Sequence, residues 1–180
     1  TQRRRQRQMC IRDRYIPKSP KIKNGKKIAL IGAGPASLTV ARDLLPLGYE
    51  CTIFEKDHKA GGLMRTNIPS FRLPADVLDE EIYRIIDMGA ELKLNSYIDK
   101  LKPVIDEYDS VFIGTGAPKG KDLNLKGREI SSENIHIGID WLTSIAFEHV
   151  KKIGKKVVVI GGGNTAMDCC RSALRLGATD

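Results

Sequence analysis

The sequence predicts an α/β fold in which helices cover a parallel sheet in a three-layer arrangement. Two observations support this prediction. A short apolar run, a glycine-rich loop and a helix follow one another at residues 27–37, and the same order returns at residues 156–166. Between the two loops, short β-type runs alternate with helical segments. A repeated strand–helix order favours parallel strands with helices packed on their faces.

The first loop has the form of a dinucleotide-binding fingerprint. Residues 27–31 fit a buried strand, and GAGPAS follows in the frame G-x-G-x-x-G/A. Gly32 permits the tight turn, and Gly34 lets the backbone approach a pyrophosphate because it has no Cβ. Ser37 stands where a third glycine is commoner, and it is small enough for the helix to pack on the strand. The alternative is a glycine turn inside some other α/β domain.

A helix is expected directly after this loop, over about residues 35–47. Pro35 suits the first turn, where a missing N–H costs little, and Pro46 is expected to distort the last turn. The amides and the dipole at the start of this helix would face the phosphates of a nucleotide.

A second strand over residues 51–55 ends in an acid, Glu55, about 20 residues after the loop. A carboxylate at this place accepts hydrogen bonds from ribose hydroxyls and repels a 2′-phosphate, which predicts FAD or NAD rather than NADP. The glycine pair Gly61-Gly62 then favours FAD, because a long flavin dinucleotide can run past its backbone amides. Arg72 could reach the flavin or its phosphates. The alternatives are an ordinary flexible turn and a solvated arginine.

The region between the loops is expected to continue the alternation of strands and helices. Residues 74–88 predict an amphipathic helix with Val77, Ile82, Ile85 and Ile86 on one side. The further elements, in chain order, are strands at 91–94 and 110–113 with a helical turn at 103–108 between them, and a helix at 139–150 that carries Trp141, Leu142, Ile145 and Ala146 inward.

The second loop, GGGNTA, follows the β-branched run 157–160, which is long enough for a central parallel strand. Asn164 or Thr165 is expected to cap the next helix, over residues 165–176. A plain βα turn is the alternative. In such folds the residue that separates NAD from NADP follows the next strand, and we expect it after Asp180, so NADH and NADPH both stay open.

The motifs together resemble the flavin module shared by the glutamate synthase small subunit, the N-terminal half of dihydropyrimidine dehydrogenase and related bacterial NAD(P)H-dependent oxidoreductases. The resemblance covers residues 27–178, and Ser37 together with FRLP at 71–74 is closer to the dihydropyrimidine dehydrogenase branch. The most specific motifs are GAGPAS at 32–37, FEK at 54–56, GGL at 61–63, IPSFRLP at 68–74, GTGA at 114–117 and GGGNTAMD at 161–168.

The resemblance implies two sets of cofactor contacts and no catalytic side chain, because the hydride passes directly between the cofactors. The expected FAD contacts are Gly32, Ala33, Gly34, Pro35, Ala36, Glu55, Lys56, Gly62, Leu63, Arg72 and Ile98. Ile98 is expected at the end of a strand region, 92–98. The expected NAD(P)H contacts are Gly162, Gly163, Asn164 and Thr165.

The implied protein is a flavin-dependent oxidoreductase that passes hydride from NAD(P)H to FAD, and electrons on to an iron–sulfur domain or an electron-accepting subunit. Its fold would be a Rossmann-like FAD domain running into a second Rossmann-like, NAD(P)-binding domain. We expect the chain to be a fragment that is inactive alone. The expected segments are a leader at 1–14, a linker at 15–26, the N-terminal part of the FAD domain at 27–117, a connecting segment with a helix at 118–155, and the start of the NAD(P) domain at 156–180.

Three other functions fit parts of the pattern. A flavin monooxygenase or a thiol-disulfide reductase would use another acceptor, and the chain has no Cys-x-x-Cys for the disulfide case. A non-catalytic nucleotide-binding module would bind cofactor without turnover. A nucleic-acid-binding protein would use the basic leader: residues 1–14 hold six arginines and one aspartate, much of the net charge of +8. We expect that leader to be non-native or disordered, and no nucleic acid to bind.

The four cysteines and three histidines are scattered, so no metal site is expected. Cys51 and Cys169 are expected to be buried thiols. Such cysteine usage suits a reducing cytoplasm, and no apolar run is long enough to span a membrane. The oligomeric state stays open.

Overall fold

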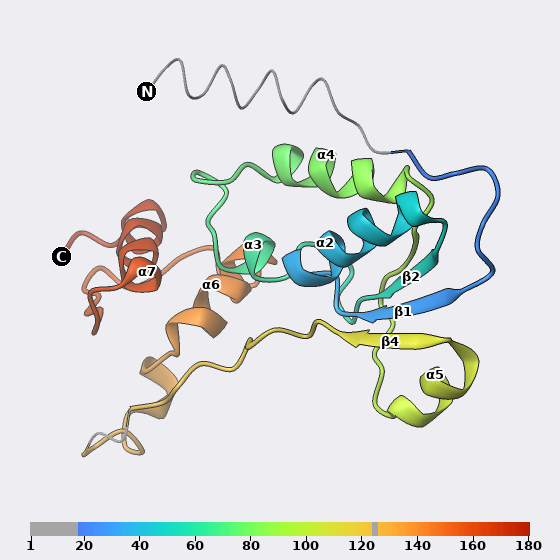
Figure 1. Cartoon of the computed structure of the whole chain (residues 1–180). Helices are drawn as coiled ribbons and strands as arrows, with labels where there is room; N and C mark the ends of the chain where they lie inside the picture. Colours follow the sequence, from blue (N-terminus) through green and yellow to red (C-terminus); the bar gives the residue numbers. More distant parts are fainter. Residues whose placement is uncertain (1–17, 124–125) are drawn as a thin grey trace.

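The computed structural model describes residues 18–123 and 126–180, and its centre is a parallel sheet (Figure 1). The sheet has four strands in the order β3-β2-β1-β4. Ile31 at the end of β1 pairs with Phe54 of β2 and with Ile113 of β4. The carboxyl ends of these three strands therefore meet at one edge. The strands are β1 (Lys27–Ile31), β2 (Glu50–Phe54), β3 (Glu91–Lys93) and β4 (Ser110–Ile113).

Helices lie on both sides of this sheet, as the sequence predicts. Figure 1 shows α2 and α4 on one side and α5 beside β4 on the other. Leu30, Leu45 and Ile53 are fully buried between the sheet and the covering helices. The helices are α2 (Pro35–Leu44), α3 (Leu63–Thr66), α4 (Ala75–Ile86), α5 (Leu101–Glu107), α6 (Gly138–Ala146) and α7 (Asn164–Arg175), with 3-10 turns η1 (Leu45–Leu47) and η2 (Ser132–Asn134).

The predicted elements of the sheet region appear in the expected order and type, while the short helix α3 was not expected and a few side chains differ. The prediction for Pro46 is confirmed, because the α-helix gives way to the 3-10 turn η1 there. Val77 was expected to face inward but is exposed, and its neighbour Leu78 is buried instead. Ala146 was also expected inward and is exposed at the end of α6. The other residues predicted for these two faces do pack on a core, so each exposed residue lies at the border of its apolar face.

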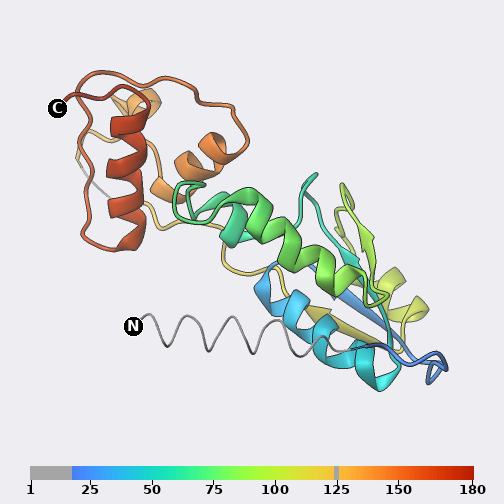
Figure 2. The ribbon, with the colours of Figure 1, turned by 90° about the horizontal axis from the view of Figure 1, so that it is seen from above.

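A second cluster of buried residues lies apart from the sheet, between α6 and α7 (Figure 2). Trp141 and Leu142 of α6 pack against Cys169 and Ala173 of α7. This cluster shares no residue with the core of the sheet.

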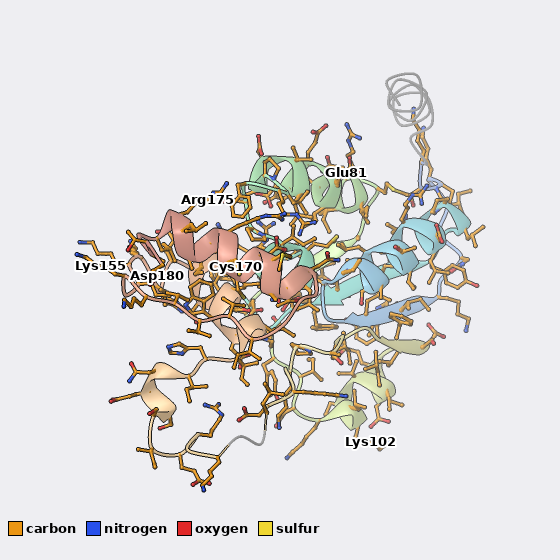
Figure 3. The ribbon with its side chains drawn as sticks, turned by 90° about the vertical axis from the view of Figure 1, so that its left-hand side faces the viewer. Glu81, Lys102, Lys155, Cys170, Arg175 and Asp180 are labelled. Atoms are coloured by element: carbon orange, nitrogen blue, oxygen red, sulfur yellow. The ribbon has the colours of Figure 1, made fainter. Side chains whose placement is uncertain are left out.

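The predicted strand at 157–160 is wrong, since the structure assigns no strand to these residues. Val157 and Val159 pack on the second cluster, while Val158 is 87% exposed. The side chains of this run thus alternate between buried and exposed as in a strand, but the backbone forms no ladder of hydrogen bonds with another described strand. Among the described residues the run's one backbone hydrogen bond is at the start, where the Val157 N–H donates to the Asp180 carbonyl. Lys155 and Asp180 accordingly lie side by side (Figure 3). A central parallel strand needs partners on both edges, and the described residues supply none.

Two further expectations concern the leader and membrane-spanning segments. The leader at 1–14 and the first residues of the linker, 15–17, lie outside the described residues. No helix in the described ranges combines the length and the apolar character that crossing a membrane requires.

Candidate functional site

The first glycine-rich loop leaves the sheet at the shared edge and packs directly on another backbone. Gly32 has a φ of +93°, and a Cβ there would lie 2.7 Å from the carbonyl oxygen of Gly114. Gly114 follows β4, so the two loops touch because their strands are neighbours. Gly32 is therefore required both by its dihedral angle and by the closeness of the Gly114 backbone.

A second glycine turn, Gly61-Gly62, packs against the first loop. Gly61 and Gly62 have φ values of +125° and +52°, and a Cβ on Gly62 would lie 2.9 Å from the Cα of Gly34. The Gly61 N–H also donates to the Ala33 carbonyl at 2.9 Å. The two glycine motifs, distant in sequence, thus form one surface of closely packed backbone, the feature that a phosphate-binding cradle requires.

Glu55 closes this arrangement at the end of β2. It is buried, and its Oε2 accepts a hydrogen bond from the Ala33 N–H at 2.8 Å while Oε1 accepts from the Asp57 N–H at 3.0 Å. Each carboxylate oxygen has a second lone-pair site. The carboxylate can therefore hold the loop and still accept hydroxyl groups of a ribose.

The start of α2 offers free donors to an anion. Gly34 is its N-cap, Pro35 occupies the first turn, and no side chain caps the helix. The amides of Ala36 and Ser37 find no acceptor among the described residues. Together with the glycine cradle and Glu55, this arrangement fits the pyrophosphate and ribose of a dinucleotide.

The remaining residues predicted for the first site divide into two groups. Pro35, Ala36 and Leu63 are exposed beside the cradle. Ala33 is buried, with its amide bound to Glu55 and its carbonyl to Gly61, so the protein itself uses both of its backbone groups.

Two other predicted contacts lie near Glu55. Lys56 follows it directly and pairs with Asp57 at 3.0 Å. Ile98 is half-buried and lies in a loop, because β3 ends at Lys93 and not at the expected 98. This loop is held beside Glu55, since the Ser96 N–H donates to the Glu55 carbonyl at 2.7 Å.

Ser37 leaves a hydroxyl buried without a partner. Its Oγ has no hydrogen-bond partner among the described residues, and it occupies the space beside Gly114 in which a Cβ would lie only 2.1 Å away. We expect Ser37→Ala to raise the free energy of unfolding by about 1 kcal/mol, because it removes an unsatisfied polar group. Chemical denaturation measures this change, with Ser70→Ala at an exposed site as the control. A lower stability of Ser37→Ala would contradict the assignment.

The side chain of Arg72 reaches α7. Its Nη1 donates to Oδ2 of Asp168 at 2.5 Å, and the Asp168 side chain is almost fully buried. The other carboxylate oxygen of Asp168 has no hydrogen-bond partner among the described residues, and Arg171 approaches it only to 3.6 Å. Arg72 thus joins the segment that follows the glycine turn to the helix of the second loop.

Two further contacts connect the segment after the glycine turn to α6 and α7. The guanidinium of Arg175 on α7 lies over the Phe71 ring, 3.8 Å from its centroid. The Asn67 amide donates to the Thr143 hydroxyl of α6 at 3.3 Å. The segment 67–72 therefore connects the sheet region to both helices of the α6–α7 pair.

The second glycine-rich loop differs from the first in being open. Gly162 and Gly163 are exposed, and a Cβ on either would meet nothing within 4 Å. The expectation that Asn164 or Thr165 caps the helix is wrong: Gly163 is the N-cap of α7, and no side chain caps it. The exposed amides at the start of α7 fit an anion, as the Gly162–Thr165 prediction requires.

Cysteine chemistry does not contribute to either loop. Burial raises the pKa of the Cys51 thiol to about 11, and burial together with Cys170 raises the pKa of Cys169 to about 11. Both are therefore protonated thiols at neutral pH, as expected for buried cysteines. Within residues 18–123 and 126–180, no group of three or more potential ligands is arranged to hold a metal ion.

Three residues that were not among the expected cofactor contacts shape the site. Gly114 packs on Gly32, Asp168 pairs with Arg72, and Arg65 reaches back to the Ala60 carbonyl at the glycine turn. Gly114 and Asp168 both stand inside motifs quoted for the resemblance, so their place in the motifs was the available signal. Arg65 had no comparable signal.

Comparison with known proteins gives consistent results. The family model described as pyridine nucleotide-disulphide oxidoreductase matches residues 26–179. The NADP(+)-dependent formate dehydrogenase subunit beta of Moorella thermoacetica is 40% identical over 88% of this chain and 23% of its own length. The glutamate synthase [NADPH] small chain of Bacillus subtilis is 35% identical over 88% of this chain and 34% of its own length. The chain thus spans about a quarter to a third of these relatives.

A solved structure gives the fold. Mycobacterium tuberculosis FprA in complex with NADPH matches with a TM-score of 0.71 and 21% identity, over 81% of this chain and 36% of that chain. At this identity the likeness shows the fold alone, a Rossmann-like parallel sheet with helices.

Proposed function

Because the chain belongs to the pyridine nucleotide-disulphide oxidoreductase family, we propose that it is the nucleotide-binding part of an NAD(P)H-dependent flavin oxidoreductase. The observation that carries the proposal is the cradle at the sheet edge, where two glycine turns and the start of α2 surround Glu55. FAD lies in this cradle, and NAD(P)H lies at the open loop before α7. Bound at these residues, the two cofactors would supply the redox chemistry, hydride transfer between nicotinamide and flavin and one-electron transfer onward.

The residues of the chain bind and orient these groups. The amides of Ala36 and Ser37 face the FAD phosphates, Glu55 accepts its ribose hydroxyls, and Gly62 and Leu63 lie along the dinucleotide. Lys56 and Ile98 line the ribose and adenine end. Gly162, Gly163, Asn164 and Thr165 hold the pyrophosphate of NAD(P)H. Arg72 pairs with Asp168 of α7 and so also orients the helix after the second loop, and its expected contact with the flavin stays part of the proposal.

The proposed domain division follows the expected boundaries, with the FAD-binding part over 27–117, a connection over 118–155 and the NAD(P)-binding part from 156. The two separate clusters of buried residues support this division. The free cysteines support a reducing, cytoplasmic location.

An iron–sulfur domain or a partner subunit is the proposed electron acceptor. The names of the relatives support the partner subunit, since one is a subunit beta and the other a small chain. The iron–sulfur domain rests on the resemblance alone. A dihydropyrimidine dehydrogenase-like enzyme is the second candidate, favoured by Ser37 and the FRLP run at 71–74.

The test is FAD retention by a Glu55→Gln variant of the protein in its full natural length. Losing the charge should raise the Kd for FAD about tenfold, because hydrogen bonds to a charged acceptor contribute about 1.5–3 kcal/mol. Flavin absorbance after gel filtration and fluorescence titration measure the change.

Glu50→Gln is the matched control, since Glu50 is exposed at the other end of β2. An unchanged Kd for Glu55→Gln would overturn the ribose role. A wild-type protein that takes up no FAD when it is offered would overturn the proposed function itself. Anaerobic reduction of the bound flavin by NADH or NADPH then identifies the donor.

A further inference from the structure

We propose that Arg65 is a positioning residue, which sets the affinity for FAD by holding the Gly61-Gly62 turn against the phosphate-binding loop. The inference rests on the proposed function and adds a determinant of the same site. It concerns a side chain that is not itself expected to touch the cofactor.

The side chain of Arg65 is buried, and both Nε and Nη2 of its guanidinium donate hydrogen bonds. Its side chain is only 8% exposed. Nε donates to the Ala60 carbonyl at 2.5 Å, and Nη2 donates to Oδ1 of Asp79 on α4. The planar fork thus connects the residue just before the glycine turn to a helix that is anchored in the core through Leu78 and Ile82.

The turn that Arg65 supports has little stiffness of its own. Two consecutive glycines lose more conformational freedom on ordering than any other pair of residues. Helix α3, which follows the turn, spans only Leu63–Thr66 and has no side-chain cap. A Cβ on Gly61 would lie 3.2 Å from the Cβ of Arg65, so the arginine packs on the turn as well as bonding to it.

The position of this turn determines the shape of the cradle. The Gly61 N–H bonds to the Ala33 carbonyl, and Gly62 touches Gly34, so any displacement of the turn opens the cradle on that side. When only a fraction of molecules hold the competent conformation, the apparent Kd rises by the inverse of that fraction. Arg65 therefore acts on FAD affinity through the population of the closed turn.

The geometry also distinguishes arginine from lysine. Two donors in a fixed plane are needed to reach a backbone carbonyl and a carboxylate together, and a lysine ammonium is a point charge on a flexible stem. Arg65→Lys keeps the charge but cannot bond to the Ala60 carbonyl and the Asp79 carboxylate at the same time. It is therefore the informative variant, and Asp79→Asn weakens the same attachment from a half-exposed carboxylate.

The experiment measures FAD binding and amide hydrogen exchange in the full-length protein and its variants. Arg65→Lys should raise the Kd for FAD on the order of tenfold, with a smaller rise for Asp79→Asn. In the FAD-free protein, the Gly61 amide should lose protection in Arg65→Lys while amides of β1 and β2 keep theirs. Arg84→Lys is the matched control, because Arg84 pairs with Glu80 on the exposed side of α4.

The outcomes separate the two proposals. If wild-type protein binds no FAD, the proposed function fails. If wild type binds FAD and Arg65→Lys binds it equally well, the role of Arg65 fails while the function stands. Equal loss of protection in the turn and in the strands would show a general effect on stability, and it would also overturn the positioning role.

Discussion

Gly32→Ala is expected to lower the free energy of unfolding by about 2–5 kcal/mol and to abolish FAD retention. Two costs add. A φ of +93° costs a residue with a Cβ about 1–2 kcal/mol, and forcing the Cβ to 2.7 Å from the Gly114 carbonyl oxygen adds about 1–3 kcal/mol. The atom in the way belongs to the backbone of the neighbouring strand end, so no side-chain rotation relieves the overlap.

Two alanine variants separate these costs in the same denaturation experiment. Gly25 has a φ of +78° and no atom within 4 Å of an added Cβ, so Gly25→Ala should show the dihedral cost alone. Gly162 has neither feature, and Gly162→Ala should leave folding unchanged. A Gly32→Ala loss no larger than that of Gly25→Ala would contradict the contact with Gly114.

Arg72→Met is expected to destabilise the protein by roughly 2 kcal/mol and to loosen α7 from the sheet region. It leaves the carboxylate of Asp168 buried, with Arg171 at 3.6 Å as the nearest cation. Removing one partner of a buried pair costs about 3–5 kcal/mol, and the value is reduced here because Arg72 is partly exposed.

A double-mutant cycle with Asp168→Asn checks this expectation. If the two groups interact as the structure indicates, the double variant should recover part of the loss of Arg72→Met, because no buried charge is left unpaired. Arg171→Met is the control and should have a small effect. Additive losses in the cycle would contradict a direct pairing of Arg72 and Asp168.

The parts of the site that could be predicted from sequence are those set by local pattern. The first loop, the helix after it and the acid at the end of β2 follow one another in the chain, and each has a local stereochemical requirement. Pro46 likewise ended its helix as its ring geometry requires. Such features need no knowledge of which strands become neighbours.

The features that were missed depend on pairing over long distances. The pairing of Arg72 with Asp168 requires α7 to pack beside the segment after the glycine turn, and no periodicity in the sequence encodes that placement. The strand expected at 157–160 failed for a related reason. The composition of this run fits a strand, but a strand also needs a neighbouring backbone to bond with. The residues of the run itself do not reveal whether such a neighbour exists.

Ser37 and Gly114 share one small volume, and this has a consequence for how their positions vary among related chains. Because the serine hydroxyl fills the place that a methyl at 114 would take, a residue larger than glycine at 114 requires a residue smaller than serine at 37. Substitutions at the third motif position should therefore co-vary with those after β4, and a motif search that scores each position independently will misjudge both.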